Sequence, residues 1–593
     1  MKKIISVLIC ISVIFATSAS ISASAKETNE GFGFFTMETE SIGDYGFTDY
    51  KFIDENGNPV CEHNRLNFIP SQKKMRLFSF MPDKYDSREH DYITDVKYQG
   101  ESGNCWAFST LSALETDSII NGYDTINDAD YSEAHLSWFS GRSLTENTND
   151  PTYGDGINYE SPYSMGGNWL TVSAPLARWN GVAEEKDYPF NPYDITQMTG
   201  YPEEKRYDTG SGIVINSSEV MLDMDDTKQW IYDHGSVTAA FYFDEPYYNS
   251  STAAYYMNSN NGSINHQITI VGWDDNYSAD NFNSLIKPEN NGAWICKNSW
   301  SEYWGDNGYF YISYYDMTIT YFAGFTAKQV NENSNNYTYN GTGYRVYFNN
   351  SSPVQTANVF TAKGCEKLTS ISIYTLTEAS DVTILIYKDI KKNYYYPNQG
   401  TLALTMETFI PREGYHTIEL DKEIQLSPGS IFSVIVECVS PSGVSYIPFE
   451  YNQSGVVYSA KEGESFVNIG RNATTWIDNT QRGWGNLYIQ AFTENSHSYI
   501  TEKTESTCQT AGSERIFCEY CGNVYSESFY ALGEHNYGEW SDFENDCNGN
   551  AVSKKICSEC GNAIIRTDRP GRFVTFQDFF EIIYNLIIKI FSP

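Results

Sequence analysis

Four residues in three separated segments carry side chains that together could attack a carbonyl carbon. Cys105 lies in QGESGNCWAFS, six residues after Gln99. A cysteine thiolate is a strong nucleophile, and a glutamine amide can donate a hydrogen bond to the oxyanion that forms. The thiol needs a base and the base needs an orienting partner, roles that His266 and Asn298 can fill. The four residues therefore predict acyl transfer through a cysteine nucleophile.

Local patterns predict the elements that would position these side chains. The apolar residues between Trp106 and Leu114 have the spacing of a buried helix, which places Cys105 at its N-terminus. The unpaired N–H groups and the dipole at that end favour a thiolate over a thiol. His266 begins the strand-like run HQITIVGW, and Asn298 follows a second such run, GAWICK. We therefore expect one helix and two strands to carry the chemistry.

These motifs resemble those of the papain family of cysteine peptidases. The resemblance extends to DKYDSRE at 83–89, YSEAHLS at 131–137 and WGDNGYFYIS at 304–313. It implies a papain-like α+β domain over 82–328, protein or peptide substrates and no cofactor for catalysis. The glycine pair would hold an extended substrate strand, and the tryptophan of NSW would shield the base. The implied catalytic residues are Cys105, His266, Asn298 and Gln99, and the implied substrate-binding residues are Gly166, Gly167 and Trp300.

Three departures from the family pattern leave the catalytic residues intact. Ser102 stands where many members carry a disulfide-bonded cysteine, and Ser301 stands where glycine is common. The long interval from Cys105 to His266 implies loop insertions, so the side-chain preference of the cleft cannot be deduced. Two other functions remain open. One is a cysteine transpeptidase, and the other is a surface adhesin or carbohydrate-binding protein with an inactive peptidase fold.

The N-terminus and the composition indicate an exported, multidomain protein. The chain has 593 residues, too many for a single core. Two lysines, an apolar run and Ala23-Ser24-Ala25 predict a signal peptide over 1–25, and hence a secreted or cell-surface protein. The formal net charge of −37 disfavours nucleic acid as a partner. Residues 26–81 are expected to form either a removable propeptide, which we favour, or a retained N-terminal extension.

The region after the peptidase-like segment has the character of an all-β sandwich. Ile371, Ile373 and Thr375 alternate with polar residues or tyrosine, and similar runs recur between turn residues. TANVFTAKG at 356–364 and WGNLYIQAF at 484–492 resemble the lectin-like domain beside surface cysteine peptidases of Gram-positive bacteria. Sugar binding does not follow from this likeness, so contact with glycan or the cell envelope and a role as a spacer or stabilising module are both open. Calcium binding is undecided.

A repeat of three cysteines follows the β-rich region. Cys508, Cys518 and Cys521 recur 39 residues further on, and glycine follows the last cysteine in both copies. Two cysteines two residues apart, with a third nearby, can bind zinc if a fourth ligand is present. Disulfides are the alternative in an exported protein. We expect zinc rather than disulfides, with Cys508, Cys518, Cys521 and His535 as its ligands.

The last segment predicts an amphipathic helix. Gln577, Glu581, Asn585 and Lys589 recur every four residues, and the other faces are apolar. Docking on a protein or the envelope competes with lying on lipid. The expected organisation is a signal peptide (1–25), a propeptide or extension (26–81), a papain-like domain (82–328), a linker (329–343), a lectin-like β-sandwich (344–496), paired Cys-rich repeats (497–570) and an amphipathic helix (571–593).

Overall fold

The chain divides into two compact units, one ending at Ser496 and the other beginning at His497. The predicted signal peptide lies outside the described residues. The computed structural model describes residues 33–42, 47–53, 59–61, 81–568 and 576–591, with gaps at 147, 158–161, 164–165, 199, 261–262, 342–344, 392–395, 451–455, 470–475 and 547–549.

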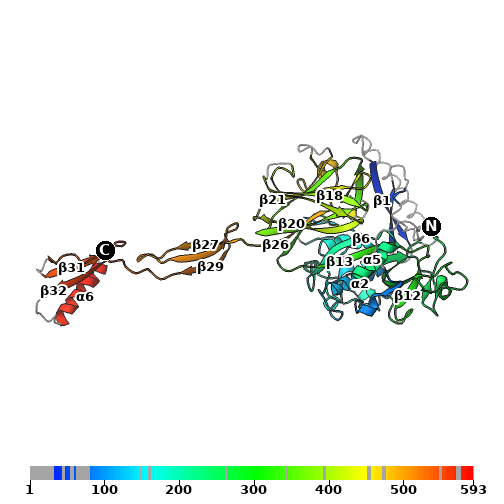
Figure 1. Ribbon diagram of the computed structural model, residues 1–593, viewed down its shortest axis with the longest axis horizontal. Coiled ribbons are helices and arrows are strands. Elements are labelled where there is room, and N and C mark those ends of the chain that lie inside the picture. The colour runs from blue at the N-terminus through cyan, green and yellow to red at the C-terminus, as the bar shows by residue number, and fades with distance from the viewer. Residues whose placement is uncertain are drawn as a thin grey trace, which may run out of the picture. The chain divides into compact units, whose positions relative to one another are not determined.

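Helix α2 (Cys105–Ile120) is the central helix of the peptidase-like part and begins at Cys105, as the sequence predicts. Every side chain from Cys105 to Ser118 is buried, because strands and helices surround α2. It contacts strands β10 (His266–Asp274) and β13 (Thr320–Gln329) and helices α3 and α4. Figure 1 shows α2 beside β13. The helices around it are α3 (Glu133–Phe139), α4 (Trp169–Ala177) and α5 (Met224–His234).

The two predicted strands after Cys105 are neighbours in one sheet and run antiparallel to each other. Strand β10 (His266–Asp274) pairs with β7 (Val237–Phe241) and with β11 (Ala293–Lys297). Because β10 and β11 are antiparallel, the start of β10 and the end of β11 lie at the same end of the sheet. The remaining strands of this part are β4 (Lys84–Asp86), β5 (Gly156–Ile157), β8 (Tyr248–Asn249), β9 (Ala254–Tyr255) and β12 (Tyr309–Ser313).

The β-rich region is a sandwich, as predicted. The alternating residues Ile371, Ile373, Val382, Ile384 and Ile386 all point into one buried core between two sheets. One layer contains β14 (Ser334–Tyr337), β17 (Glu366–Thr375), β20 (Gly414–Leu426) and β26 (Ile489–Asn495). The other contains β16 (Gln355–Thr361), β18 (Ser380–Ile390), β19 (Thr401–Ile410), β21 (Ile431–Val439), β24 (Ser465–Asn468) and β25 (Ile477–Asp478).

The segment 329–343 is not a plain linker, because it contributes strand β14 to the sandwich. β14 pairs with β26, and the Tyr337 side chain is buried with its hydroxyl on the Glu366 carboxylate. The polar composition that suggested a linker reflects an edge strand whose other side chains are only partly covered. Polar residues are compatible with such a strand, because its backbone supplies the pairing.

Backbone pairing joins the peptidase-like part to the sandwich in one continuous sheet. Strand β6 (Ile213–Val220) pairs with β13 (Thr320–Gln329) on one side and with β20 on the other. Arg412, just before β20, binds the carboxylates of Glu219 and Asp226 at 3.1 and 2.7 Å. Figure 1 shows β6 beside β20 and β13. The two regions therefore share a sheet as well as side-chain contacts.

The predicted propeptide region contains strands that pair with the sandwich. Strand β1 (Gly33–Ile42) pairs with β15 (Arg345–Asn350), with Phe34 opposite Phe348. β15 in turn pairs with β22 (Ser445–Glu450). In the same sheet, β1 also pairs with β2 (Phe47–Ile53), which pairs with β3 (Pro59–Cys61). Elsewhere, the short strand β23 (Val456–Val457) pairs with β5.

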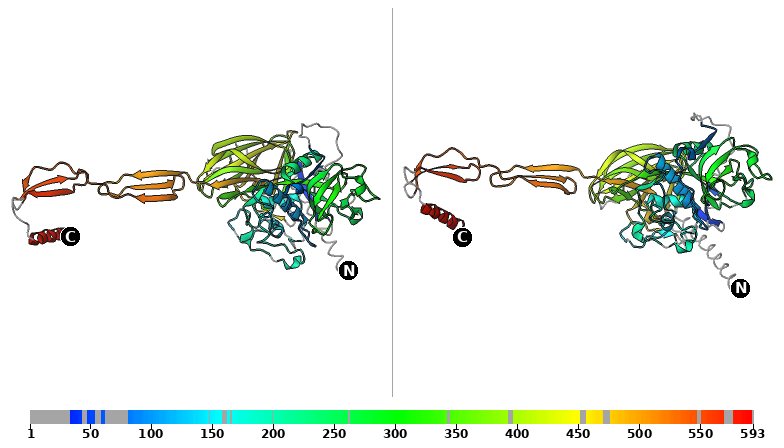
Figure 2. Two further views of the ribbon diagram at one scale, coloured as in Figure 1. Left: turned by 60° about the horizontal axis from the view of Figure 1, so that its bottom comes forward. Right: turned by 90° about the horizontal axis from the view of Figure 1, so that it is seen from below.

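The second unit consists of two small antiparallel sheets and a helix (Figure 2). The predicted C-terminal helix is confirmed as α6 (Phe576–Phe591). The apolar side chains described on α6 are exposed, Phe580 at 63% for example. Among the described helices, none has the length and apolar character needed to cross a bilayer. The strands are β27 (Tyr499–Thr504), β28 (Ser513–Cys518), β29 (Val524–Phe529), β30 (Glu544–Asn545), β31 (Ala551–Ile556) and β32 (Ala563–Asp568).

Candidate active site

The candidate nucleophile occupies the first residue of α2. Asn104 precedes it as the N-cap and makes no side-chain cap hydrogen bond. The Cys105 side chain is 3% exposed and packs against Ala240. Ala240 lies opposite Gln267 in the β7–β10 ladder, so this contact brings the thiol to the start of β10, next to His266. The fold therefore gathers residues that are far apart in the sequence.

The candidate base is held by two neighbours from the segment after β11. Asn298 Oδ1 lies 2.8 Å from His266 Nε2, which fixes that nitrogen as the N–H donor when the ring is neutral. Nδ1 is then the nitrogen that can accept a proton from a thiol. The Trp300 indole stacks on the imidazole, with ring centroids 4.4 Å apart and planes inclined at 22°. The ring therefore has both its tautomer and its orientation fixed.

Gln99 is buried and held at both ends of its amide. Its Nε2 donates to the Ser102 carbonyl at 2.8 Å, and its Oε1 accepts from the Ser299 hydroxyl at 2.6 Å. An amide nitrogen carries two protons, so one proton stays available for an oxyanion. The sequence reasoning missed Ser299, although it directly follows Asn298 in the KNSW motif.

Burial opposes charge on both members of the candidate pair. It raises the pKa of the Cys105 thiol to about 12. It lowers the pKa of the His266 imidazole to about 4, against the opposing hydrogen bond to Asn298. The free energy that burial costs such a thiolate is on the order of 4 kcal/mol, whereas a helix N-terminus supplies about 0.3–1 kcal/mol. Burial therefore favours the neutral thiol and imidazole in this structure.

The glycine pair lies against the nucleophile's own helix. Gly166 and Gly167 are both buried. A Cβ atom on Gly167 would lie 2.8 Å from the Trp106 indole, which is too close for any side chain. Trp300 belongs to an aromatic layer with Phe243 and Trp304, at centroid distances of 4.9 and 5.0 Å. The predicted substrate-binding residues are thus packed next to Cys105 and His266.

A buried charge network supports the segments that carry Gln99 and Asn298. The Lys97 ammonium lies 3.1 Å from Glu115 and 3.0 Å from Glu133, both of them buried. Lys297, directly before Asn298, donates to the hydroxyls of Thr94 and Ser112 at 3.0 and 3.1 Å. Burial lowers the pKa of Lys297 to about 8. This network lies behind the site and anchors both segments to α2.

The predicted zinc ligands in the second unit do not all come together. Cys508 and His535 lie with Cys557 and Cys560, where the four ligand atoms are within 4.8 Å of one another. The prediction grouped Cys508 with the other cysteines of its own repeat. Cys508 lies before β28 and Cys518 at its last residue, and the two sulfurs belong to different groups of side chains.

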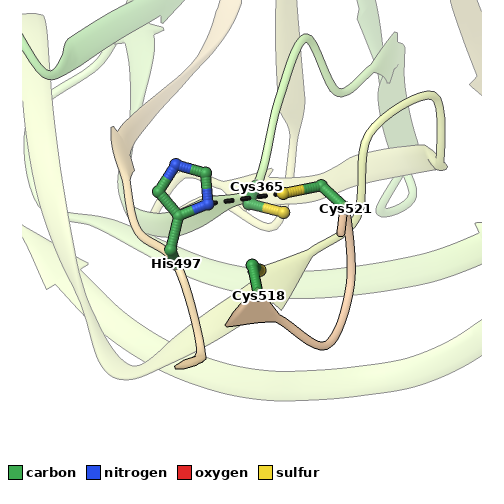
Figure 3. Close-up of side chains that lie close together, drawn as sticks. All are labelled: Cys365, His497, Cys518 and Cys521. Atoms are coloured by element: carbon green, nitrogen blue, oxygen red, sulfur yellow. Dashed lines mark hydrogen bonds between the residues drawn. The ribbon is translucent and has the colours of Figure 1, made fainter. Parts of the chain in front are cut away.

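Cys518 and Cys521 lie in a second cluster with His497. Cys521 Sγ and His497 Nδ1 are 3.4 Å apart. Figure 3 shows the ring and this sulfur pointing toward each other, with Cys518 beside them. The predicted set is therefore divided between two groups of side chains.

Two family models match the first unit. A model of the papain family cysteine proteases matches residues 81–323, and a model of a lectin-like domain matches residues 337–493. Cysteine proteinase 1 of Zea mays is 27% identical over 238 residues, which are 39% of this chain and 56% of the maize protein. Cathepsin S of Mus musculus is 26% identical over 240 residues, 39% of this chain and 58% of the mouse protein. The chain thus covers little more than half of each relative.

Solved structures extend the likeness across both domains. The cysteine protease and lectin-like domains of Cwp84, a surface layer associated protein of Clostridium difficile, are 27% identical to this chain, with a TM-score of 0.60. The match covers 70% of this chain and 89% of that one. A second Cwp84 structure, determined after propeptide cleavage, is 26% identical, with a TM-score of 0.59 and coverage of 70% and 99%. This protein therefore contains a papain-family cysteine protease domain followed by a lectin-like domain.

Proposed function

We propose that the papain-family domain makes this protein a cysteine endopeptidase that is exported and acts at the cell surface. One observation carries the proposal. Cys105 begins α2 beside the strand start that holds His266, and His266 is paired with Asn298. Export is supported by the signal-like N-terminus, and a surface location by the likeness to a surface layer associated protein. The proposed substrates are proteins or peptides.

The side chains divide the reaction among them. His266 Nδ1 takes the proton of Cys105, and the thiolate attacks the scissile carbonyl carbon. The free amide proton of Gln99 and the backbone N–H of Cys105 stabilise the oxyanion, a donor of this kind contributing about 2.7–4 kcal/mol. The amine leaves with the proton from His266, and water then hydrolyses the thioester. Asn298 keeps the imidazole ring aligned through both steps.

Activation by removal of residues before the peptidase domain is part of the proposal. Burial favours the neutral forms of Cys105 and His266, so greater exposure to water would favour the ion pair. The Cwp84 structure determined after propeptide cleavage supports a cleavable segment here. N-terminal sequencing of the active protein tests this step. A fully active chain that still begins at Lys26 would rule out a propeptide.

The lectin-like domain is proposed to hold the protease against glycan of the cell envelope. Because it shares a sheet with the peptidase domain, binding there would present the cleft in one fixed orientation. Binding of the catalytically inactive Cys105→Ala protein to purified envelope glycan tests the idea. Absence of binding would leave the domain a structural support.

Cleavage of a peptide library by the mature protein tests the catalytic proposal. Cys105→Ala should remove activity by a factor of about 10⁴ or more, by analogy with nucleophile losses in other proteases. Cys438→Ser, a cysteine of the lectin-like domain, is the matched control and should retain activity. Labelling by an epoxysuccinyl inhibitor should require Cys105. An unlabelled protein without cleavage would favour the binding function, and products joined to an added amine would identify a transpeptidase.

A further inference from the structure

The second unit has almost no hydrophobic core to hold its two sheets. Its buried positions among the described residues are Cys508, Gly512, Cys518, Ser553 and Cys557. Strand β29 is exposed along its whole length. Small antiparallel sheets without an apolar core are marginally stable in water, and proteins of this size usually add metal ions or disulfides. The burial of cysteines in place of leucines or valines therefore indicates that the sulfurs stabilise the fold.

Four side chains from both repeats converge at one point of this unit. Along the chain, Cys508 lies in the loop between β27 and β28, and His535 lies in the segment between β29 and β30. Cys557 and Cys560 lie in the turn between β31 and β32. Cys508 Sγ is 3.8 Å from Cys557 Sγ, and Cys560 Sγ is 3.2 Å from His535 Nδ1. In a tetrahedral zinc site with bonds of about 2.3 Å to sulfur, neighbouring sulfurs are about 3.8 Å apart. The observed separation matches that spacing and is far too long for a disulfide, whose S–S bond is about 2.05 Å.

The backbone around Cys557 and Cys560 has the shape of a metal-binding turn. The Gly561 N–H donates to the Cys557 carbonyl at 3.0 Å, and Gly561 adopts a left-handed φ of 72°. The Asn562 N–H points at Cys560 Sγ from 3.5 Å, an arrangement that stabilises a thiolate. The Asn562 side-chain amide lies 3.4 Å from His535 Nε2, which carries the ring proton when Nδ1 binds a metal, so the amide must turn its oxygen toward Nε2 to fix the ring.

We propose that Cys508, His535, Cys557 and Cys560 bind one structural zinc ion that joins the first repeat to the second. Zinc replaces the protons of three thiols and bonds to the lone pair of His535 Nδ1, so binding releases up to three protons. The closed set of four protein ligands leaves no open position for a substrate, which makes the ion structural. The ligands come from consecutive repeats, so the ion acts as a cross-link between them.

The turn that holds Cys518 and Cys521 repeats the same local geometry. The Gly522 N–H donates to the Cys518 carbonyl at 2.8 Å, and φ of Gly522 is also 72°. His497 precedes Cys518 much as His535 precedes Cys557. Each repeat therefore contains the same local motif, a histidine followed by a turn with two cysteines. Cys508 adds the fourth ligand to the later copy.

The test measures zinc in the full-length protein carrying Cys105→Ala, which prevents self-cleavage and removes the catalytic thiol as a metal ligand. Zinc per chain is determined by mass spectrometry after gel filtration in chelator-free buffer. Cys557→Ser should lose one zinc ion per chain relative to the parent, and His535→Ala should release zinc to a chelator at least about tenfold faster. Cys438→Ser, which changes a cysteine outside both clusters, should keep the parent's zinc content.

Cobalt substitution separates loss of a ligand from loss of folding. Cys557→His offers an imidazole in place of the thiolate, so it should keep the metal. The thiolate-to-cobalt absorption of this site should fall by about a third, because two thiolates replace three. A zinc content unaffected by Cys557→Ser would overturn the proposal. A parent protein without zinc, or with a disulfide between Cys508 and another cysteine in its peptide map, would overturn it as well.

Discussion

The Trp300 indole covers one face of the His266 imidazole, with the ring centroids 4.4 Å apart. Trp300 is itself held edge-on by Phe243 and Trp304. His266 and Asn298 are each 3% exposed, so the hydrogen bond between them is shielded from water, and Trp300 forms part of that shield by stacking on the imidazole. The strength of that bond, and with it the tautomer of the base, therefore depends on an aromatic side chain that takes no direct part in the proposed chemistry.

Removing this aromatic cover should slow peptide cleavage. Trp300→Ala is expected to lower kcat on the order of tenfold, because a stacked aromatic pair is worth about 0.5–1.5 kcal/mol and the exposed bond is weakened further. The neighbouring Tyr303 is 91% exposed, so Tyr303→Ala is the control and should retain full activity. Steady-state kinetics on one peptide substrate measure both. Equal activity of the two variants would show that Trp300 does not shield the base.

Ser299 should act through Gln99 alone. Ser299→Ala removes the hydroxyl that holds Gln99 Oε1, a hydrogen bond worth about 1 kcal/mol, and should lower kcat several-fold with little change in KM. Gln99→Ala removes the oxyanion donor and should cost about 10²–10³ in kcat. The double variant should be no slower than Gln99→Ala. Additive losses in this cycle would show that Ser299 works independently of Gln99.

The ion pairs between the two domains should differ greatly in how much they contribute to the unfolding free energy. Arg412→Met leaves the largely buried carboxylates of Glu219 and Asp226 without their cation, and should lower the unfolding free energy on the order of 3 kcal/mol. Lys328→Met removes the more exposed pair with Glu419 and should cost less than about 1 kcal/mol. Urea denaturation of both variants in a Cys105→Ala protein measures the difference. Similar losses would mean that Arg412 stabilises the interface no more than a surface pair does.

Acid should destabilise the peptidase domain partly through His135. Its ring is fully buried beside the Lys205 carbonyl, and burial lowers its pKa to about 4. Between about pH 6.5 and 4 the unfolded chain binds a proton that the folded chain does not. The unfolding free energy should therefore fall as the pH drops through this window, by up to about 3 kcal/mol from this residue.

His135→Leu tests that contribution because leucine fills the space without titrating. Urea denaturation at several pH values should give a flatter dependence between pH 4 and 6.5 for this variant. His90→Leu, the same substitution at an exposed histidine, is the matched control. An unchanged slope in His135→Leu would assign the acid sensitivity to other groups.

Replacing Ser301 by glycine should stabilise the fold. Ser301 has φ of 75°, in the left-handed region that costs a residue with a side chain about 1–2 kcal/mol. Glycine loses about 0.5–1 kcal/mol through the entropy of the unfolded chain, so Ser301→Gly should gain on the order of 0.5 kcal/mol. Glu302→Gly, at an exposed neighbour without positive φ, should be destabilising. A lower melting temperature for Ser301→Gly would contradict the hypothesis that the backbone at Ser301 is strained.

The residues of the candidate active site could be found in the sequence because each lies in a short local motif. Cys105 and Gln99 share one segment, while His266 and Asn298 begin or follow an apolar strand, so local patterns also predict their elements. Ser299 was missed because its role depends on a contact with Gln99, two hundred positions earlier. The burial that keeps Cys105 neutral likewise depends on segments that local patterns do not bring together.

Pairings between distant segments explain the other differences. The sequence pattern groups the predicted zinc ligands by repeat, whereas the three-dimensional cluster takes Cys508 from one repeat and Cys557 from the next. The residues of β14 are polar and resemble a linker, because partner strand β26 lies far along the chain. The pairing of Ser217 with His416 has no local signature at all, since both strands read as ordinary β-structure. Periodicity reports which face is buried, and it does not report what covers that face.

Because the two domains share a sheet, we expect them to be inherited as one unit. The backbone of Ser217 to Glu219 in β6 meets β13 on one side and β20 on the other, so the catalytic domain has no finished edge of its own there. A gene recombination that separated the peptidase domain from its partner would leave the backbone N–H and C=O groups along one edge of β6 unpaired. An exposed strand edge of this kind promotes aggregation. Natural selection is thus expected to transmit this pair of domains together, and to exchange partners only where a new strand can close the same edge.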